Sequence, residues 1–198
     1  MDATPDGSPL AVVLAVSVGR PRARPHPAAP ERTYRTAIAK RPVTGPAQVG
    51  TLGLAGDAQA DRRHHGGPDK AVHAHFAQPW WGQQRDRPVR PGEIGENLTL
   101  AAAAGAPEPD ESTFCEGDVL AVGTALLQVT APRLPCFKQA DRLGLPDAVA
   151  RAEASGRTGF YLRVLREGEV AAGDAVQLLQ RTAPQRSLAE ANRRRARA

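Results

Sequence analysis

Cys136 is the residue of this chain best suited to metal or redox chemistry. The two prolines before it, Pro132 and Pro135, stiffen the backbone, because each fixes its own φ angle and restricts the preceding residue. Arg133 and Lys138 flank the thiol, and nearby positive charge favours the thiolate. A thiolate in a stiff loop is a good ligand for a soft transition metal. Cys136 is therefore the candidate metal ligand, and a buried structural cysteine is the alternative.

A second candidate segment runs from Gly56 to His73 and is rich in glycine, arginine and histidine. The pair Gly66-Gly67 allows the backbone to approach a ligand closely. Arg62 and Lys70 can donate hydrogen bonds to a phosphate or another oxyanion. The segment is not a Walker loop, because no serine or threonine follows the lysine. It predicts an oxyanion-binding loop, with a solvated basic loop as the alternative.

Four histidines in the same region raise the question of zinc: His64, His65, His73 and His75. His73 and His75 would share one face of a strand and form a usable pair of ligands. Because no matching carboxylate motif is nearby, we favour solvated histidines over a zinc site.

The third candidate segment spans residues 90–100 and places Glu96 and Asn97 after two glycines. A tight loop of this composition would present the side-chain amide of Asn97 to a ligand as a paired donor and acceptor. Carboxylates and imidazoles are common proton donors in enzymes. Asp57, His73 and Glu96 are the candidates for that role, and the sequence does not choose among them.

The elements that must position these residues are short strands and a few helices. Apolar runs predict strands over 10–18, 71–76, 119–122, 125–130, 160–165 and 175–179. Helices are expected over 78–87 and 146–154, and Ser187 with Glu190 forms a capping box for a terminal helix. The turn Gly123-Thr124 indicates a hairpin. Residues 20–30 contain four prolines and predict a loop.

Composition narrows the class of protein further. The 18 prolines and 19 glycines among 198 residues favour a turn-rich, mainly β fold, and Gly-Asp turns that lead into short strands are typical of a small β-barrel. Only two cysteines argue against a disulfide scaffold and fit a reducing, cytoplasmic location. The longest apolar run, residues 10–18, is too short to cross a membrane and lacks the basic start of a signal peptide.

The net charge of +5 depends on four arginines among the last six residues. A basic tail of this kind can bind nucleic acid. Aromatic residues, which usually stack on bases, make up only 4% of the chain. A solvated tail is therefore favoured over nucleic-acid binding.

Six segments taken together resemble a MOSC domain, the fold named for the C-terminal part of molybdenum cofactor sulfurases. They are residues 38–43, 53–61, 65–73, 91–99, 132–138 and 155–161, and the similarity spans about residues 10–180. The pattern is most similar to the stand-alone bacterial YiiM type, which resembles a 6-N-hydroxylaminopurine reductase. This implies a mainly β, MOSC-type β-barrel with a few short helices and a truncated helical C-terminal tail. The implied parts are a disordered N-terminus (1–9), the MOSC domain (10–180) and a basic, partly helical tail (181–198).

The resemblance also implies a cofactor and an activity. MOSC proteins bind molybdenum on molybdopterin, with a protein cysteine as a further sulfur ligand, and here that role falls on Cys136. The residues implied in cofactor binding are Arg62, His65, Lys70, Asn97, Arg133 and Lys138. The implied reaction reduces a small N-hydroxylated compound, such as an N-hydroxylated nucleobase, to an amine. The candidate catalytic residues are Cys136, Asp57, His73 and Glu96.

The expected partners follow from this chemistry. The sequence has no flavin or iron–sulfur motif, so electrons must come from a separate reductase. No membrane is expected to take part, and a homodimer is compatible with the resemblance. An alternative function is a non-catalytic carrier of the molybdenum cofactor or its sulfur, which would use the same residues. A nucleic-acid-binding module built on the arginine tail ranks last.

Overall fold

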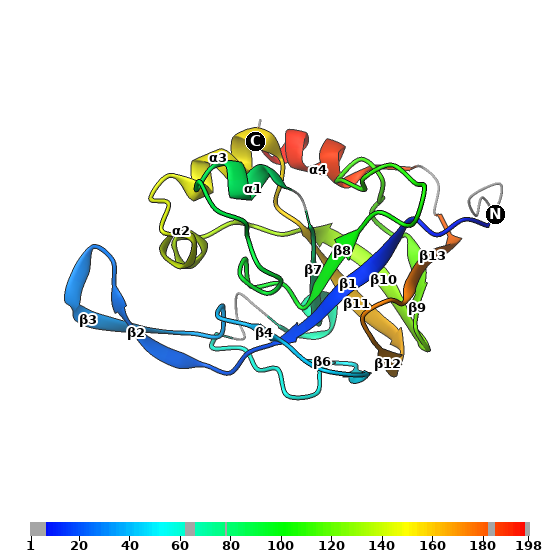
Figure 1. Cartoon of the computed structure of the whole chain (residues 1–198), viewed down its shortest axis with the longest axis horizontal. Helices are drawn as coiled ribbons and strands as arrows, with labels where there is room; N and C mark the ends of the chain where they lie inside the picture. The colour runs from blue at the N-terminus through cyan, green and yellow to red at the C-terminus, as the bar shows by residue number, and fades with distance from the viewer. Residues whose placement is uncertain (1–6, 62–65, 78, 182–184, 197–198) are drawn as a thin grey trace.

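The protein is built around a closed barrel of seven strands (Figure 1), seen in a computed structural model that describes residues 7–61, 66–77, 79–181 and 185–196. The strands follow the order β13-β9-β10-β11-β7-β8-β1, and β1 closes the barrel by pairing with β13. Only the β7–β8 pair within this ring is parallel. Their bounds are β1 (Ala11–Val18), β7 (Val72–Phe76), β8 (Leu98–Ala101), β9 (Val119–Val122), β10 (Ala125–Pro132), β11 (Phe160–Arg166) and β13 (Ala175–Gln180). The predicted mainly β barrel is confirmed.

The core fills the barrel interior with alternating apolar side chains. Along β9 and β10, alternate residues are buried, as expected for strands with one face on a core. Phe76, Phe114 and Phe160 form an aromatic cluster with ring centroids 5.1 to 5.8 Å apart. The continuous apolar run over residues 10–18 is typical of a strand buried on both faces, but half of the surface of Leu14 is exposed. This packed core fixes the positions of the strands and of the loops that follow them.

The predicted hairpin between β9 and β10 is confirmed. Val122 pairs with Ala125 on either side of Gly123-Thr124. Gly123 has a φ of 57°, and a Cβ there would lie 2.2 Å from the carbonyl oxygen of Glu169. Only glycine meets both conditions, which is why this dipeptide is a strong local signal.

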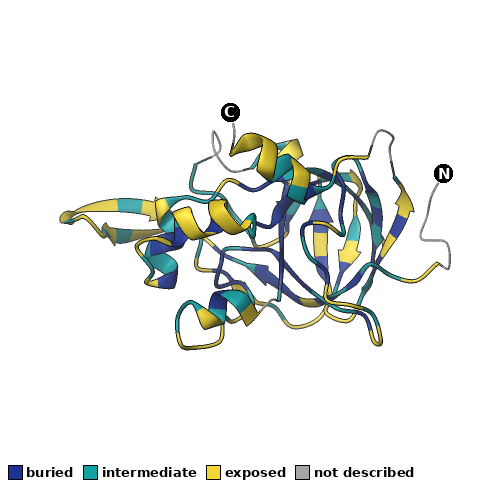
Figure 2. Cartoon of the chain, turned by 90° about the horizontal axis from the view of Figure 1, so that it is seen from above, coloured by how far each residue is buried: buried dark blue, intermediate teal, exposed yellow. Residues whose placement is uncertain are grey.

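Residues 20–30 do not form the predicted loop, because most of them belong to a two-stranded arm. The strands β2 (Arg22–His26) and β3 (Ala29–Thr36) pair with each other and project from the barrel (Figures 1 and 2). Prolines are tolerated there because each strand of a two-stranded ribbon has one edge without ladder hydrogen bonds. The hydroxyl of Tyr34 donates to Asp141 Oδ2 at 2.5 Å, and its ring lies 5.2 Å from Phe137.

Short helices and smaller strands surround the barrel. The helices are α1 (Pro79–Gln83), α2 (Phe137–Leu143), α3 (Ala148–Ser155) and α4 (Leu188–Arg195), and Pro68–Lys70 forms a 3-10 turn, η1. The remaining strands are β4 (Arg41–Pro42), β5 (Ala47–Gly50), β6 (Gly53–Leu54) and β12 (Gly168–Val170). In Figure 1 the four α-helices lie on one side of the barrel. None of the helices in the described ranges has the length and apolar character needed to cross a membrane.

The helix predictions are confirmed at three places, while α2 has no counterpart in the sequence prediction. α1 and α3 fall within or close to the expected ranges. The capping box of α4 is present: Ser187 Oγ accepts from the Glu190 amide at 3.2 Å, and the Ser187 amide donates to Glu190 Oε2 at 2.8 Å. α2 is only seven residues long and is held by packing with α3 and Trp81 in a second apolar cluster. Tertiary packing stabilises such a short helix.

Candidate functional site

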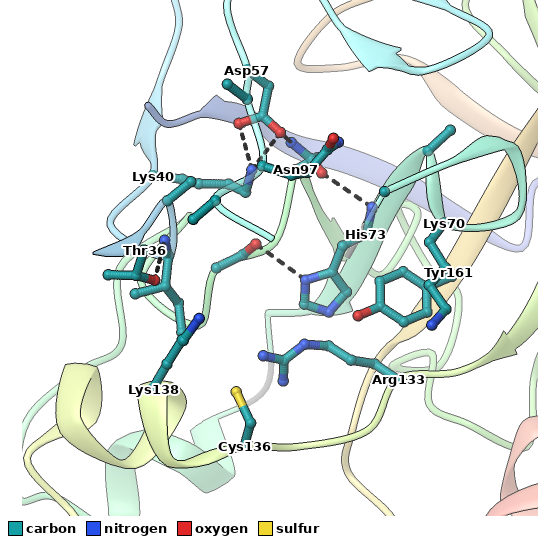
Figure 3. A pocket seen from close by; sticks show the side chains of 18 residues that line it. Thr36, Lys40, Asp57, Lys70, His73, Asn97, Arg133, Cys136, Lys138 and Tyr161 are labelled. Atoms are coloured by element: carbon teal, nitrogen blue, oxygen red, sulfur yellow. Dashed lines mark hydrogen bonds and ion pairs between the residues drawn. The ribbon is translucent and has the colours of Figure 1, made fainter. Parts of the chain in front are cut away.

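A pocket beside the barrel gathers most of the candidate residues (Figure 3). The loop after β10 brings Arg133 and Cys136 to it, η1 brings Lys70, and β7 brings His73. The segment that follows β3 adds Lys40 from the opposite wall. These segments are far apart in the sequence, so the barrel and its loops create the site.

Cys136 lines this pocket and is the last residue before α2. Its thiol points into the pocket in Figure 3, and the residue is partly exposed. Its carbonyl accepts from the Gln139 amide at 2.9 Å, which starts the first turn of α2. The alternative of a buried structural cysteine therefore does not apply to Cys136. It does apply to Cys115, which is 5% exposed and whose thiol has its pKa raised by burial.

Arg133 is held rigidly between Cys136 and His73 (Figure 3). Its side chain is buried, and its Nη1 donates to Gln139 Oε1 at 2.6 Å. Gln139 belongs to α2 and has no exposed surface. The helix that directly follows Cys136 therefore also holds the neighbouring guanidinium. No role for Gln139 was predictable from the sequence, because its partner becomes adjacent only when α2 forms.

Two lysines complete the positive lining. Lys70 Nζ lies 5.7 Å from the ring centroid of Tyr161, and Lys138 Nζ lies 5.9 Å from that of Tyr34. Tyr161 lines the pocket and has its pKa raised by burial. This tyrosine was not among the predicted site residues, although it lies in one of the MOSC-like segments. Of the four cations implied in cofactor binding, Lys70, Arg133 and Lys138 line this one pocket, and Arg62 lies outside the described residues.

Asp57 and Lys40 form a buried ion pair at the far wall of the pocket. Lys40 Nζ lies 2.5 Å from both carboxylate oxygens, and the Gly19 amide donates to Asp57 Oδ1 at 2.7 Å. Burial lowers the pKa of Lys40, and the charge of Asp57 opposes this shift. Both carboxylate oxygens are thus engaged within the protein. The structure assigns Asp57 to holding the pocket wall rather than to the suggested proton donation.

Asn97 does not present its amide to a ligand as the sequence suggests. Its Nδ2 donates to the Ser17 carbonyl at 3.1 Å and to Asp57 Oδ2 at 3.0 Å. Its Oδ1 accepts from the His73 amide at 3.1 Å. The side chain lines the pocket, but its hydrogen bonds join β1 to β7 and the Asp57 loop. This network was invisible in the sequence because its partners are up to 80 residues away.

Glu96 is not among the residues that line the Cys136 pocket. Its carboxylate accepts from the Gly92 amide at 2.6 Å, the Ile94 amide at 3.1 Å and Thr99 Oγ1 at 2.9 Å. Burial raises its pKa, against the effect of these hydrogen bonds. Glu96 therefore stabilises the 92–96 loop by accepting hydrogen bonds from its backbone amides. The structure does not bring it together with Cys136 as a proton donor.

His73 offers the pocket an unshared hydrogen-bond acceptor. Its Nδ1 lies 3.2 Å from the Gly95 carbonyl, which can only accept, so Nδ1 carries the proton. Nε2 is buried and has no hydrogen-bond partner among the described residues. Burial and then the charge of Arg133 lower the pKa of His73 well below 6.5. The ring is therefore neutral at pH 7, and Nε2 accepts hydrogen bonds rather than supplying protons.

The residues that the structure describes do not form a zinc site. His75 Nδ1 lies 3.0 Å from the Phe76 carbonyl, and its ring is perpendicular to that of His73. Within the described ranges, no three His, Cys, Asp or Glu side chains are placed to hold a metal ion together. Arg62, His64 and His65 lie outside the described residues.

Acidification is expected to destabilise the fold through His75. Burial lowers the pKa of His75 from 6.5 to about 4. Between these values the unfolded chain binds a proton at His75 and the folded protein does not, so stability falls as the pH drops. This difference corresponds to about 3 kcal/mol at 1.36 kcal/mol per pKa unit. Urea unfolding at about pH 7 and pH 4.5 measures the effect.

The control for this experiment is His75→Gln. Glu96 and Glu111 have pKa values raised by burial, and protonation of these carboxyls acts in the opposite direction. The variant keeps both carboxyls, so the difference between wild type and variant isolates the histidine. An identical pH dependence in the two proteins would contradict the assignment.

Residues 61–177 match the MOSC domain model, and the chain belongs to the MOSC domain family. It is 37% identical over 183 residues to "Uncharacterized protein YflK" of Bacillus subtilis, covering 91% of this chain and 79% of that protein. It is 33% identical over 153 residues to "Protein YiiM" of Escherichia coli, covering 74% and 65% of the two chains. It is thus a MOSC protein of the YiiM type.

A solved structure and a fungal protein extend the comparison. The crystal structure of YiiM from Geobacillus stearothermophilus has a TM-score of 0.74 and 32% identity, covering 94% of this chain and 84% of that one. A protein of Gibberella moniliformis named "Reductase" is 33% identical over 164 residues. That match covers 80% of this chain but only 28% of the fungal protein. The relatives of this MOSC protein therefore include a reductase.

Proposed function

We propose that this protein is a molybdenum cofactor-dependent oxidoreductase that reduces small N-hydroxylated compounds, N-hydroxylated nucleobases among them, to amines. The observation that carries the proposal is the Cys136 thiol, which points into a pocket lined by Lys70, Arg133 and Lys138. The MOSC family and a reductase among the relatives support the same class of activity.

The donor set of the pocket fits an anionic, sulfur-bound molybdenum cofactor. A thiolate is a soft ligand, and Cys136 supplies one at the pocket wall. The three cations match a phosphate group, with Arg133 preorganised by Gln139. His73 Nε2 is an unshared acceptor that matches an N–H group of a pterin ring. When bound, the molybdenum centre would supply the two electrons that, with two protons from solvent, convert N–OH to N–H with release of water.

In this proposal the chain's own residues bind the cofactor and orient it. Cys136 would hold the metal from its position just before α2, and Gln139 keeps Arg133 in place beside it. The buried, hydrogen-bonded network of Lys40, Asp57 and Asn97 forms one wall of the pocket. A cofactor enzyme needs this division of roles, because the cofactor performs the electron transfer and the protein positions it.

Electrons must come from outside these residues. Iron–sulfur clusters need several cysteine ligands, and this chain has two, of which Cys115 is buried in another part of the fold. We propose a separate reductase as the electron donor. Both thiols are free, which fits the proposed reducing, cytoplasmic location.

The direct test measures metal content and turnover together. The protein, produced in cells that make the molybdenum cofactor, is expected to contain equimolar molybdenum. It is expected to reduce 6-N-hydroxylaminopurine when a chemically reduced viologen supplies electrons. A fully active preparation without molybdenum would refute the proposal. Bound cofactor without any turnover would instead identify a carrier of the cofactor or its sulfur.

A further inference from the structure

A second hollow adjoins the cofactor pocket at Cys136, and we call it the outer groove. Lys70, Cys136, Lys138 and Tyr161 line both hollows. Only the outer groove is also lined by Leu134, Phe137, Arg186, Ala191 and Arg195. A molecule in the outer groove would therefore lie beside the cofactor and would reach the same thiol.

The floor of the outer groove is apolar and exposed. Leu134 and Phe137 flank Cys136 in the sequence, and 58% and 42% of their surfaces are accessible. Pro132 and Pro135 add rigid apolar surface to the same floor. Large apolar side chains are usually buried, so an exposed group of them beside a reactive position indicates a ligand surface. A flat ring matches such a floor.

The wall of the outer groove is provided by α4. Leu188 is buried, and Ala191 and Arg195 follow it at intervals of three and four residues, so the three share one helix face. Arg193 and Arg194 do not line the groove. All three arginines are exposed, and Arg195 is the one that the helix register places beside the groove, seven residues after the buried Leu188.

Arg195 has donors left for an anion. Its Nη2 donates to the Pro132 carbonyl at 3.3 Å and to Asn192 Oδ1 at 3.5 Å. Its Nε and Nη1 groups bond to none of the described residues. The other arginine of the groove, Arg186, is paired with Glu116. Asp61 also borders the groove, but Lys70, Lys138 and Arg195 outnumber its single charge.

We infer that the outer groove binds the substrate as a nucleotide, with the base on the Leu134–Phe137 floor and the phosphate at Arg195. This inference rests on the proposed reductase function and specifies its substrate class. A guanidinium with free donors binds phosphate in a bidentate manner, and a free base leaves these donors to water. The substrate is thus the N-hydroxylated nucleoside 5′-monophosphate, in preference to the free base.

The first experiment compares two substrates of the holoprotein with the viologen donor. We expect kcat/KM for N6-hydroxyadenosine 5′-monophosphate to exceed that for 6-N-hydroxylaminopurine by about tenfold, the low end expected for hydrogen bonds to a charged group. Arg195→Gln is expected to reduce this preference to about unity. Arg193→Gln removes an equal charge from the same helix outside the groove and is expected to keep the preference.

The second experiment measures binding without turnover. AMP and adenosine carry no N–OH group, so calorimetry on the holoprotein reports affinity alone. We expect AMP to bind about tenfold more tightly than adenosine, and this difference to disappear in Arg195→Gln. 4-(Hydroxyamino)benzoate is a third substrate for the turnover assay of the first experiment. It tests a carboxylate as the alternative to the phosphate, because its carboxylate is close to the ring.

The outcomes separate the two proposals. Equal kcat/KM for nucleotide and base, or a preference for the benzoate, would overturn the nucleotide inference and leave the reductase function standing. Tighter binding of AMP through Arg195 without any turnover would support the groove and contradict the reductase function.

Discussion

Replacing Cys136 by serine is expected to lower the reduction of N-hydroxylated bases by at least about a hundredfold. The partners that support metal ligands already contribute 10–100-fold, so loss of a ligand has at least about this effect. Serine keeps the size of the side chain and exchanges a soft sulfur for a hard oxygen, which suits molybdenum on a dithiolene less well. The partly exposed position means that the fold should tolerate the change.

The measurement needs three readouts on the same preparation: turnover, molybdenum content and melting temperature. Cys115→Ala is the matched control, because the Cys115 thiol is buried and does not line the pocket. This variant is expected to leave turnover unchanged. A Cys136→Ser protein with wild-type turnover and molybdenum content would show that the thiol does not hold the cofactor. An unchanged melting temperature in an inactive variant assigns the loss to the site.

Asp57→Ala is expected to cause the largest loss of stability, about 3–5 kcal/mol, because it leaves Lys40 charged and buried without its partner. Asp57 also accepts hydrogen bonds from the Gly19 amide and Asn97 Nδ2, which lose their acceptor. For a chain of this size the loss lowers the melting temperature by roughly 10 °C. Thermal unfolding followed by circular dichroism measures it directly.

Two further variants make this second prediction specific. Asp69→Ala removes a carboxylate from an exposed ion pair with Arg163 and is expected to cost less than about 1 kcal/mol. The double variant Lys40→Met, Asp57→Leu replaces the buried pair by apolar groups and is expected to regain much of the stability. Equal losses for Asp57→Ala and Asp69→Ala would contradict the role given to the buried pair.

The sequence predicted the barrel well because local signals set most of its strands. Gly123 has room for no side chain and a positive φ, so its dipeptide specified the β9–β10 turn without help from distant residues. The arm at residues 20–30 was missed because prolines usually indicate a loop. They are accommodated there because the ribbon stands apart from the barrel and leaves strand edges open.

The candidate site was predictable in its chemistry and not in its division of roles. Residue types alone selected Cys136 as the metal ligand. In the structure, Lys70, Arg133 and Lys138 line the same pocket as this thiol. The roles of Asn97, Glu96 and Asp57 depended on partners brought close only by folding, such as the Ser17 carbonyl 80 residues from Asn97. Each proves to be engaged with the protein, because a buried polar group is stable only when its hydrogen bonds are satisfied.

The amino-acid order alone determined a mainly β chain with one thiol held between prolines and flanked by positive charge. These properties are local, since turn residues, alternating apolar residues and neighbouring charges act over a few positions. Only the tertiary structure decided that α2 fixes Arg133 through Gln139 and that Arg195 of α4 borders the same thiol. Such contacts join residues that the backbone separates, and packing of the barrel and its helices is what brings them together.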